Sequence, residues 1–305
     1  MTLPFKSLLP LLLVHLCAKS AYSSTWKFWK WGANTGLESL AKGLRNGMPY
    51  ETSSLMDKKL ALSLLSFSNA SYYYPNPSPT LKGRYFCEAF ELIKTHKKNS
   101  VSFSAYISPD EATVVIAFRG SMTWKNIGTD LNAALRPCNL FSRSLSCGSL
   151  HAGFLEAYHS INLELIRLLK AVRPRRIYIT GHSLGGALSI LAGFELTSLG
   201  ESFFGQSVLI SVVTFGAPRV GTELFEKAYH SLRIHTVRIQ TANKWNRDWV
   251  TLLPSKEYGY ANPVKPGLYA ACLFADCLTT AIHYTHAYEI SMSDATPVDE
   301  PCLNF

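Results

Sequence analysis

A serine between two glycines is the feature of this chain best suited to covalent chemistry. The run Gly181-His182-Ser183-Leu184-Gly185 lies between an apolar segment predicted to be a strand, 175–180, and a segment rich in small residues predicted to be a helix, 185–199. A G-x-S-x-G run in a strand–turn–helix context is typical of a nucleophile elbow, which lifts the serine hydroxyl above a sheet. Side chains at positions 181 and 185 would collide with neighbouring backbone in so tight a turn. We therefore predict that Ser183 is a nucleophile.

A serine attacks only when a base removes its proton and an acid orients that base, so two further residues are needed. Asp248 follows a predicted strand, 232–240, in the loop 246–254, where site residues of an open α/β sheet are found. The base is expected at His286, just ahead of a predicted terminal strand at 287–292, with His283 as the alternative. We expect His182, beside the serine, to pack or hydrogen-bond behind the elbow.

The negative charge that develops on the substrate carbonyl oxygen needs backbone N–H donors. One donor is expected at Leu184, directly after the nucleophile, where the start of a helix also favours negative charge. The other is expected at Ser121, in the loop after a strand predicted at 112–118. These positions form the predicted oxyanion hole.

Strands and helices alternate around these residues. The hydrophobic pattern predicts further strands at 101–107 and 208–215 and an amphipathic helix at 153–170. This order indicates an α/β fold with a mostly parallel central sheet and helices on both faces. At 305 residues and 47% hydrophobic content, the chain can bury one large core, and we place a single domain at 51–305.

The first 50 residues differ in character from the rest. Residues 1–20 hold one lysine, a short apolar run and then small residues, which is typical of a cleaved secretory signal peptide. The segment 21–50 is basic and rich in tryptophan, and it either lies at a membrane surface or packs on its own domain. The net charge of +9 suits an anionic partner such as a lipid surface, but no long Lys/Arg run is present and no nucleic acid partner is expected.

Seven cysteines are present, and removal of Cys17 with the signal peptide leaves six, enough for three disulfides in an oxidising compartment. Short loops favour the pairs Cys138–Cys147 and Cys272–Cys277, which leaves Cys87 for Cys302. Asn69 begins the one N-glycosylation sequon of the chain.

Several ordered motifs resemble the class 3 (fungal-type) lipases. These are Phe118-Arg119-Gly120-Ser121, His151-Ala152-Gly153-Phe154, the elbow 181–188, the run 214–221 and Asp248-Trp249-Val250 with Leu253-Pro254. The resemblance covers about residue 55 to the C-terminus. It implies an α/β-hydrolase fold, a triad of Ser183, Asp248 and a histidine, an acyl-ester substrate, and no metal or cofactor. The run 284–289 fits the family pattern for the base only approximately, so His286 and His283 both stay open.

The resemblance also implies a function. We expect a secreted lipase that cleaves triacylglycerol through an acyl-enzyme, with phospholipase A1 or another carboxylesterase, including a feruloyl-type enzyme, as alternatives. A lipid-binding protein without turnover is the rival of another class. Residues 121–131 resemble an amphipathic lid that would open on a lipid surface, although an ordinary surface helix has the same pattern. The expected partners are a lipid ester substrate and, transiently, a lipid or membrane surface.

Overall fold

The central element is an eight-stranded sheet in the order β1-β2-β3-β4-β7-β8-β10-β12. In the computed structural model, the described residues are 55–121, 134–140, 147–242, 248–262, 268–271, 283, 285 and 288, all within the compact unit Ser53–Phe305. The strands are β1 Thr80–Leu81, β2 Phe90–Lys98, β3 Val101–Ile107, β4 Thr113–Phe118, β7 Arg176–His182, β8 Leu209–Phe215, β10 His235–Ala242 and β12 Leu268–Ala271.

The sheet changes from antiparallel to parallel at β4. Strands β1 to β4 pair antiparallel in succession, whereas β4, β7, β8, β10 and β12 all run parallel. Parallel neighbours need crossover connections, and helices supply them. They are α5 Ala152–Val172 between β4 and β7, α6 Leu184–Phe204 between β7 and β8, and α7 Glu223–Ser231 between β8 and β10.

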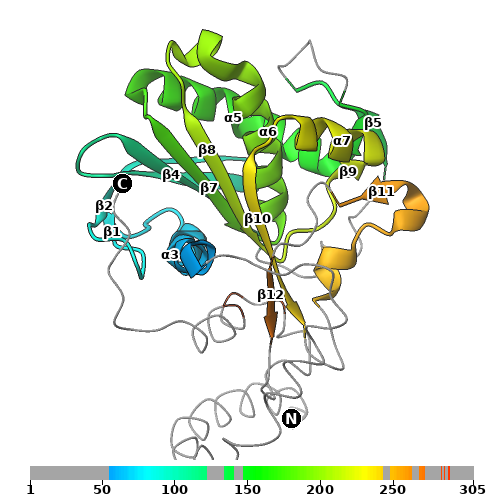
Figure 1. The fold of residues 1–305 in the computed structure, drawn as a ribbon, viewed down its shortest axis with the longest axis horizontal. Helices are drawn as coiled ribbons and strands as arrows, with labels where there is room; N and C mark the ends of the chain where they lie inside the picture. Colours follow the sequence, from blue (N-terminus) through cyan, green and yellow to red (C-terminus); the bar gives the residue numbers. More distant parts are fainter. Residues whose placement is uncertain are drawn as a thin grey trace, which may run out of the picture. The chain divides into compact units, whose positions relative to one another are not determined.

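Helices cover both faces of the sheet, as the sequence predicts (Figure 1). Along β4, Val114, Ile116 and Phe118 join a core that includes residues of α5 and α6. Val115 and Ala117 point the other way and join a core that includes residues of α3, Leu55–Ala70. Because successive side chains of a strand alternate between faces, a strand buried on both sides becomes a continuous apolar run. The α/β-hydrolase fold class is therefore confirmed.

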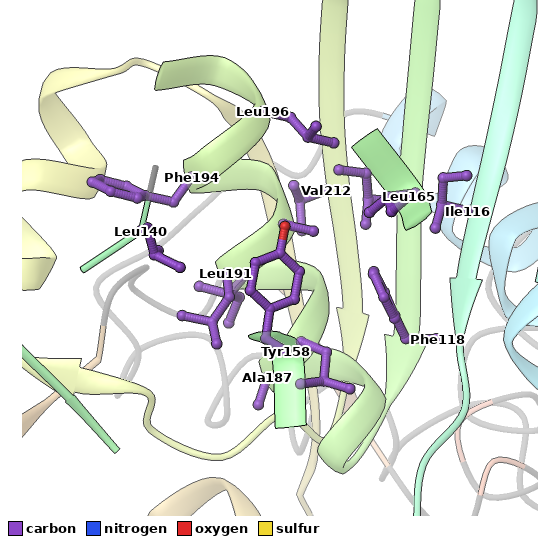
Figure 2. Packing of buried hydrophobic residues seen from close by; sticks show 14 of the residues in the cluster. Ile116, Phe118, Leu140, Tyr158, Leu165, Ala187, Leu191, Phe194, Leu196 and Val212 are labelled. Atoms are coloured by element: carbon purple, nitrogen blue, oxygen red, sulfur yellow. The ribbon is translucent and has the colours of Figure 1, made fainter. Parts of the chain in front are cut away.

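A polar cluster lies within the core between α5, α6 and the sheet. Figure 2 shows Tyr158 among Leu165, Leu191, Phe118 and the other labelled side chains. The Tyr158 hydroxyl donates to Glu195 Oε2 over 2.6 Å, and Asn162 Nδ2 lies 3.3 Å from the same carboxylate. These contacts join α5 to α6 and meet part of the hydrogen-bonding need of a buried carboxyl group.

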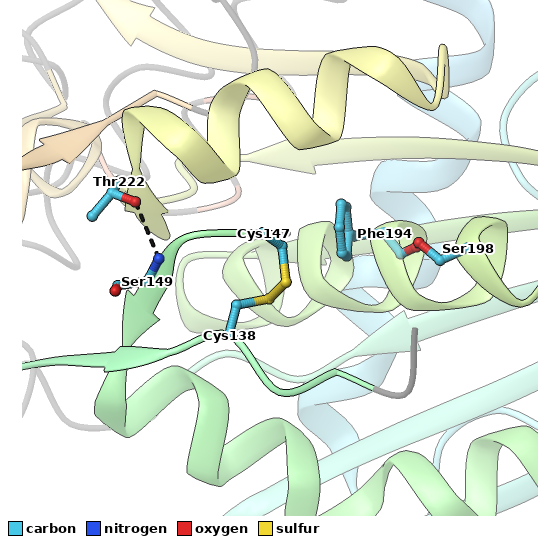
Figure 3. Close-up of a disulfide and its surroundings, with 6 residues drawn as sticks. All are labelled: Cys138, Cys147, Ser149, Phe194, Ser198 and Thr222. Atoms are coloured by element: carbon cyan, nitrogen blue, oxygen red, sulfur yellow. Dashed lines mark hydrogen bonds between the residues drawn. A yellow bond between two sulfur atoms is a disulfide. The ribbon is translucent and has the colours of Figure 1, made fainter. Parts of the chain in front are cut away.

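A second, four-stranded sheet has the order β11-β9-β6-β5. It comprises β5 Leu135–Pro137, β6 Ser149–His151, β9 Gly221–Thr222 and β11 Tyr260–Ala261, and all its pairs are antiparallel. A disulfide joins Cys138 to Cys147 beside it, with Cα atoms 5.6 Å apart (Figure 3). Cys87 is also disulfide-bonded, and its expected partner Cys302 lies outside the described residues, as do Cys272 and Cys277.

Most of the predicted elements are present with small shifts of their ends, but some expectations cannot be read from the structure. The segments 1–20 and 21–50 and residues 122–131, where a lid is expected, lie outside the described part of the chain. The strand expected at 287–292 is wrong at Tyr288, which has helical conformation. Asn69 is half-buried near the end of α3, and no hydrogen-bond partner lies near its buried Oδ1 among the described residues. Within that part of the chain, no helix has the length and apolar character needed to cross a membrane.

Candidate catalytic site

Ser183 occupies the sharp turn between β7 and α6. Its backbone angles are φ 58° and ψ −124°, a conformation that L residues adopt rarely and that tertiary contacts must maintain. The Ser183 N–H donates to the Phe215 carbonyl of β8 over 2.9 Å, which anchors the turn to the neighbouring strand. Its side chain is buried, and no hydrogen-bond partner lies near its Oγ among the described residues. The bond to Phe215 therefore anchors the backbone of the residue that carries the hydroxyl.

The two glycines of the elbow are required by close backbone contacts. A Cβ atom at Gly181 would collide with the backbone of Gly185, and a Cβ atom at Gly185 would collide with the Phe118 carbonyl at the end of β4. At each of the two positions, therefore, only the hydrogen atom of a glycine fits in place of a side chain, as the sequence predicts. The same packing places the end of β4 directly against the start of α6.

Asp248 lies after β10, at the start of the 3-10 helix η2, Trp249–Leu252. Its carboxylate is fully buried and receives three donors. The Val250 N–H donates to Oδ1 over 3.0 Å, whereas the Tyr288 hydroxyl, at 2.5 Å, and His283 Nδ1, at 2.7 Å, both reach Oδ2. Burial raises the pKa of Tyr288 well above its usual value, and the negative charge of Asp248 raises it further, so the phenol stays protonated and donates.

The histidine that meets this aspartate is His283, which the sequence offers as the alternative base. His283 is fully buried. An ionised carboxylate can only accept, so Nδ1 of His283 carries the proton in this contact and Nε2 is the basic nitrogen. His286, the base preferred from the sequence, lies outside the described residues.

The end of β8 contacts both the turn that carries Ser183 and the Asp248–His283 pair. Phe215 binds Ser183 through its carbonyl, and the next residue, Gly216, has φ +59°. A Cβ atom at Gly216 would lie 2.7 Å from Asp248 Oδ2, 2.8 Å from the Tyr288 hydroxyl and 2.9 Å from His283 Cε1. Two consecutive residues of one strand end thus contact all members of the candidate triad.

The loop that is expected to supply the second oxyanion donor packs against the elbow. A Cβ atom at Gly120 would lie 2.7 Å from the His182 carbonyl oxygen, so this loop approaches the turn as closely as the backbone allows. Ser121 and Leu184, the two expected donors, are both half-buried. The structure therefore brings together the two segments that carry the predicted oxyanion hole.

Two buried arginines hold the acid loop, which we define as Asp248–Pro254. The Arg219 guanidinium donates to the carbonyl of Leu252 and, over 2.8 Å, to that of Pro254. Arg238, fully buried on β10, donates to the carbonyls of Ala217, at 2.6 Å, and Thr251, at 3.3 Å. Burial lowers the pKa of Arg219, but its usual value is so high that the group remains charged.

Sequence reasoning assigns no role to Gly216, Tyr288 or the two arginines. Gly216 and Arg219 stand in one run, Gly216-Ala217-Pro218-Arg219, whose glycine and proline at a strand end mark a special turn. That signal was available from the sequence. Tyr288 and Arg238 show no local signal, because their partners come from distant parts of the chain.

His182 is buried and makes contacts on the side of the elbow that faces His283. Its Nε2 lies 2.5 Å from the main-chain carbonyl oxygen of His283, and its Nδ1 lies 2.7 Å from the Tyr72 hydroxyl. The expectation of a hydrogen-bonding role is consistent with these contacts.

Comparison with known proteins identifies relatives of this chain. The family model described as Lipase (class 3) matches residues 115–282, more than half of the chain. Secreted mono- and diacylglycerol lipase 1 from Fusarium solani is 33% identical over 127 residues, which are 40% of this chain and 35% of that protein. Phospholipase A1-II 1 from Oryza sativa is 26% identical over 224 residues, 62% of this chain and 56% of that protein. The chain therefore spans about a third of the first relative and just over half of the second.

A solved structure supports the same fold. The triacylglycerol lipase from Penicillium expansum superposes with a TM-score of 0.56 over 72% of this chain and 81% of that one, at 18% identity. At this level of identity, the likeness shows the fold alone.

Proposed function

The chain belongs to the class 3 lipase family, and we propose that it is a serine ester hydrolase acting on lipid esters, with triacylglycerol as its principal substrate. The observation that carries the proposal is the 2.7 Å contact of Asp248 with His283 beside the strained Ser183. A neutral histidine oriented by a buried carboxylate is the base that an otherwise unreactive serine needs. The relatives named as a mono- and diacylglycerol lipase and as a phospholipase A1 support the choice of lipid esters.

In the proposed mechanism, Ser183 Oγ attacks the carbonyl carbon of the ester while His283 Nε2 takes the hydroxyl proton. Asp248 holds the imidazole through Nδ1 and stabilises the imidazolium that forms. The Leu184 N–H, at the start of α6, and the Ser121 N–H bind the oxyanion. We assign the base to His283 rather than His286 because His283 makes the contact with the aspartate.

The ester bond then breaks, and the imidazolium gives its proton to the departing alcohol. An acyl group remains on Ser183. A water molecule, deprotonated by His283, attacks this acyl-enzyme and releases the fatty acid, which restores the serine. No metal or cofactor is needed for any of these steps.

A phospholipase A1 activity is the second candidate, and the match to the rice phospholipase favours it. Both reactions use the same triad and differ only in the lipid that the pocket admits. The deciding experiment compares fatty-acid release from emulsified triacylglycerol and from phosphatidylcholine vesicles, with Ser183→Ala as the control. Faster release from triacylglycerol supports the main proposal, and faster release from vesicles supports the second.

A fluorophosphonate probe separates turnover from mere lipid binding, because it reacts only with an activated serine. Labelling of the wild type but not of Ser183→Ala is expected. A folded wild-type protein that neither labels nor releases fatty acid would instead be a lipid-binding protein on a lipase scaffold.

We further propose that the protein is secreted after removal of residues 1–20. One of its relatives is named as a secreted lipase, and the chain carries a disulfide, which favours an oxidising compartment. N-terminal sequencing of the protein recovered from culture medium tests the cleavage. The mass of the same sample before and after glycosidase treatment tests glycosylation at Asn69.

A further inference from the structure

Tyr72, His182 and His283 form a chain of hydrogen bonds that the proposed triad chemistry does not use. Tyr72 belongs to the 3-10 helix η1, Ser71–Tyr73, and its hydroxyl lies 2.7 Å from His182 Nδ1. His182 Nε2 in turn lies 2.5 Å from the carbonyl oxygen of His283. The rings of His182 and His283 also pack together, with centroids 4.5 Å apart.

The chemistry of the partners fixes the direction of each bond. A carbonyl oxygen can only accept, so His182 Nε2 carries a hydrogen and donates a hydrogen bond to the carbonyl oxygen of His283. In a neutral imidazole the other nitrogen is then an acceptor, so the Tyr72 hydroxyl donates to Nδ1. One tautomer of His182 satisfies both bonds.

Burial keeps Tyr72 and His182 in the protonation states that the two hydrogen bonds require. Desolvation lowers the pKa of His182 well below its usual value, and the nearby His283 lowers it further. Burial likewise raises the pKa of Tyr72, so the phenol keeps its proton. His182 thus stays neutral, and it adds no second positive charge beside His283 when the base becomes an imidazolium.

These hydrogen bonds connect three parts of the site. His182 directly precedes the nucleophile, so its bond to His283 links the backbone of the base to the elbow. A Cβ atom at Gly120 would collide with the Tyr72 hydroxyl, which places the oxyanion loop against the same chain. The bond ends on the main chain of His283 and not on its ring, whose Nδ1 bonds to Asp248.

We propose that His182 and Tyr72 are positioning residues that fix the main chain of the catalytic histidine. The Tyr72 hydroxyl donates to His182 Nδ1, and His182 Nε2–H donates to the carbonyl oxygen of His283. This inference rests on the proposed function, because it takes His283 as the base. Loss of these two hydrogen bonds should leave substrate binding intact and slow the proton transfers of the reaction.

Two amide substitutions at position 182 separate this role from simple packing. In His182→Gln, the amide nitrogen is as many bonds from Cα as Nε2 and can still donate to His283. In His182→Asn, the amide reaches only as far as Nδ1, so the bond to His283 is lost. Because misplacement by about 1 Å can cost about 100-fold in rate, we expect kcat to fall about 10- to 100-fold in His182→Asn and in His182→Leu. His182→Gln should stay within about fivefold of the wild type, with KM nearly unchanged in all three.

Tyr72→Phe tests the other end of the chain with His182 intact. Without the phenol donor, His182 can adopt either tautomer, and we expect kcat to fall by about three- to tenfold. Melting temperatures of all variants accompany the kinetics. If His182→Leu does not fold, the comparison of Gln with Asn decides the question by itself.

The proposal is overturned if His182→Asn is as active as His182→Gln, or if His182→Gln is as slow as His182→Leu while both are folded. Failure of the proposed function looks different: the wild type itself would neither hydrolyse esters nor react with the fluorophosphonate probe. An active wild type with unaffected variants removes only the positioning role.

Discussion

Gly216 offers a sharp test of the candidate site, because one added methyl group would press on the acid and the base together. In Gly216→Ala, the new Cβ atom would lie 2.7 Å from Asp248 Oδ2 and 2.9 Å from His283 Cε1. Ordinary contacts to carbon need about 3.5 Å, so these atoms must separate by roughly 0.6 to 0.8 Å. A displacement of nearly 1 Å in a catalytic group costs about 100-fold in rate. We expect kcat to fall by about that factor.

The same substitution also strains the backbone, and this effect must be measured separately. Gly216 has φ +59°, a region that costs an L residue about 1 to 2 kcal/mol. In a domain of this size, that loss lowers the melting temperature by about 2 to 8 °C. The protein should therefore remain folded at assay temperature while its activity is reduced.

Gly200 supplies the matched control. It has φ +62°, lies near the opposite end of α6 from Ser183, and has no atom within 4 Å of the position that a Cβ would take. Gly200→Ala should lower the melting temperature by the amount that backbone strain alone costs and leave kcat unchanged, whereas Gly216→Ala also carries the clash with Asp248 and His283. The assay is hydrolysis of a soluble short-chain ester at several concentrations, beside thermal unfolding of each variant. Equal kcat values for the two variants would refute the placement of Gly216 against the catalytic pair.

The remaining predictions concern the base, its environment and the supporting loops. His283→Ala should lower kcat by roughly 10⁴-fold or more, whereas His286→Ala should stay within about threefold of the wild type, as measured by ester hydrolysis. The reverse order would restore His286 as the base. Tyr288→Phe removes one donor from the buried Asp248 carboxylate, so the free energy of unfolding in urea should drop by about 1 to 3 kcal/mol, and an unchanged value would contradict this contact. Arg219→Met leaves two acid-loop carbonyls without their donor, so both stability and kcat should fall; loss of stability alone would show that the arginine does not position the acid. Burial lowers the pKa of His151 from 6.5 to about 4. Between these two pH values the unfolded protein binds more protons than the folded protein, so the free energy of unfolding should decline as pH falls from 6.5 towards 4. His151→Asn keeps a helix-capping acceptor that does not titrate, and urea midpoints across this pH range should decline less in this variant than in the wild type.

The parts of the site that could be predicted are those whose signal is local. The elbow is recognisable because glycines, serine, strand and helix are contiguous, and the close contacts of Gly181 and Gly185 show why no other residue fits. Asp248 is predicted because a loop after a strand in an α/β sheet opens at the edge where sites form. In both cases, a few neighbouring residues contain the whole physical reason.

Among the elements that escaped prediction, α3 and β2 show how burial or irregularity erases periodicity. Helix α3 has buried apolar side chains on most of its circumference, including Leu60, Leu62, Leu64 and Phe67, so it lacks the single apolar stripe of a surface helix. Strand β2 shifts register between Leu92 and Lys94, and such an irregularity breaks the alternation of inward and outward side chains.

The choice of base shows where sequence reasoning reaches its limit. The sequence favours His286 because a terminal strand is expected behind it, but that strand is wrong at Tyr288, which is helical. What distinguishes His283 is its 2.7 Å contact with Asp248, together with the bond from His182 to its main chain. Both contacts join residues that are far apart in the chain, and no spacing between two nearby histidines encodes them. A serine hydrolase can therefore be inferred from its elbow, whereas its base is defined by the tertiary contacts that surround it.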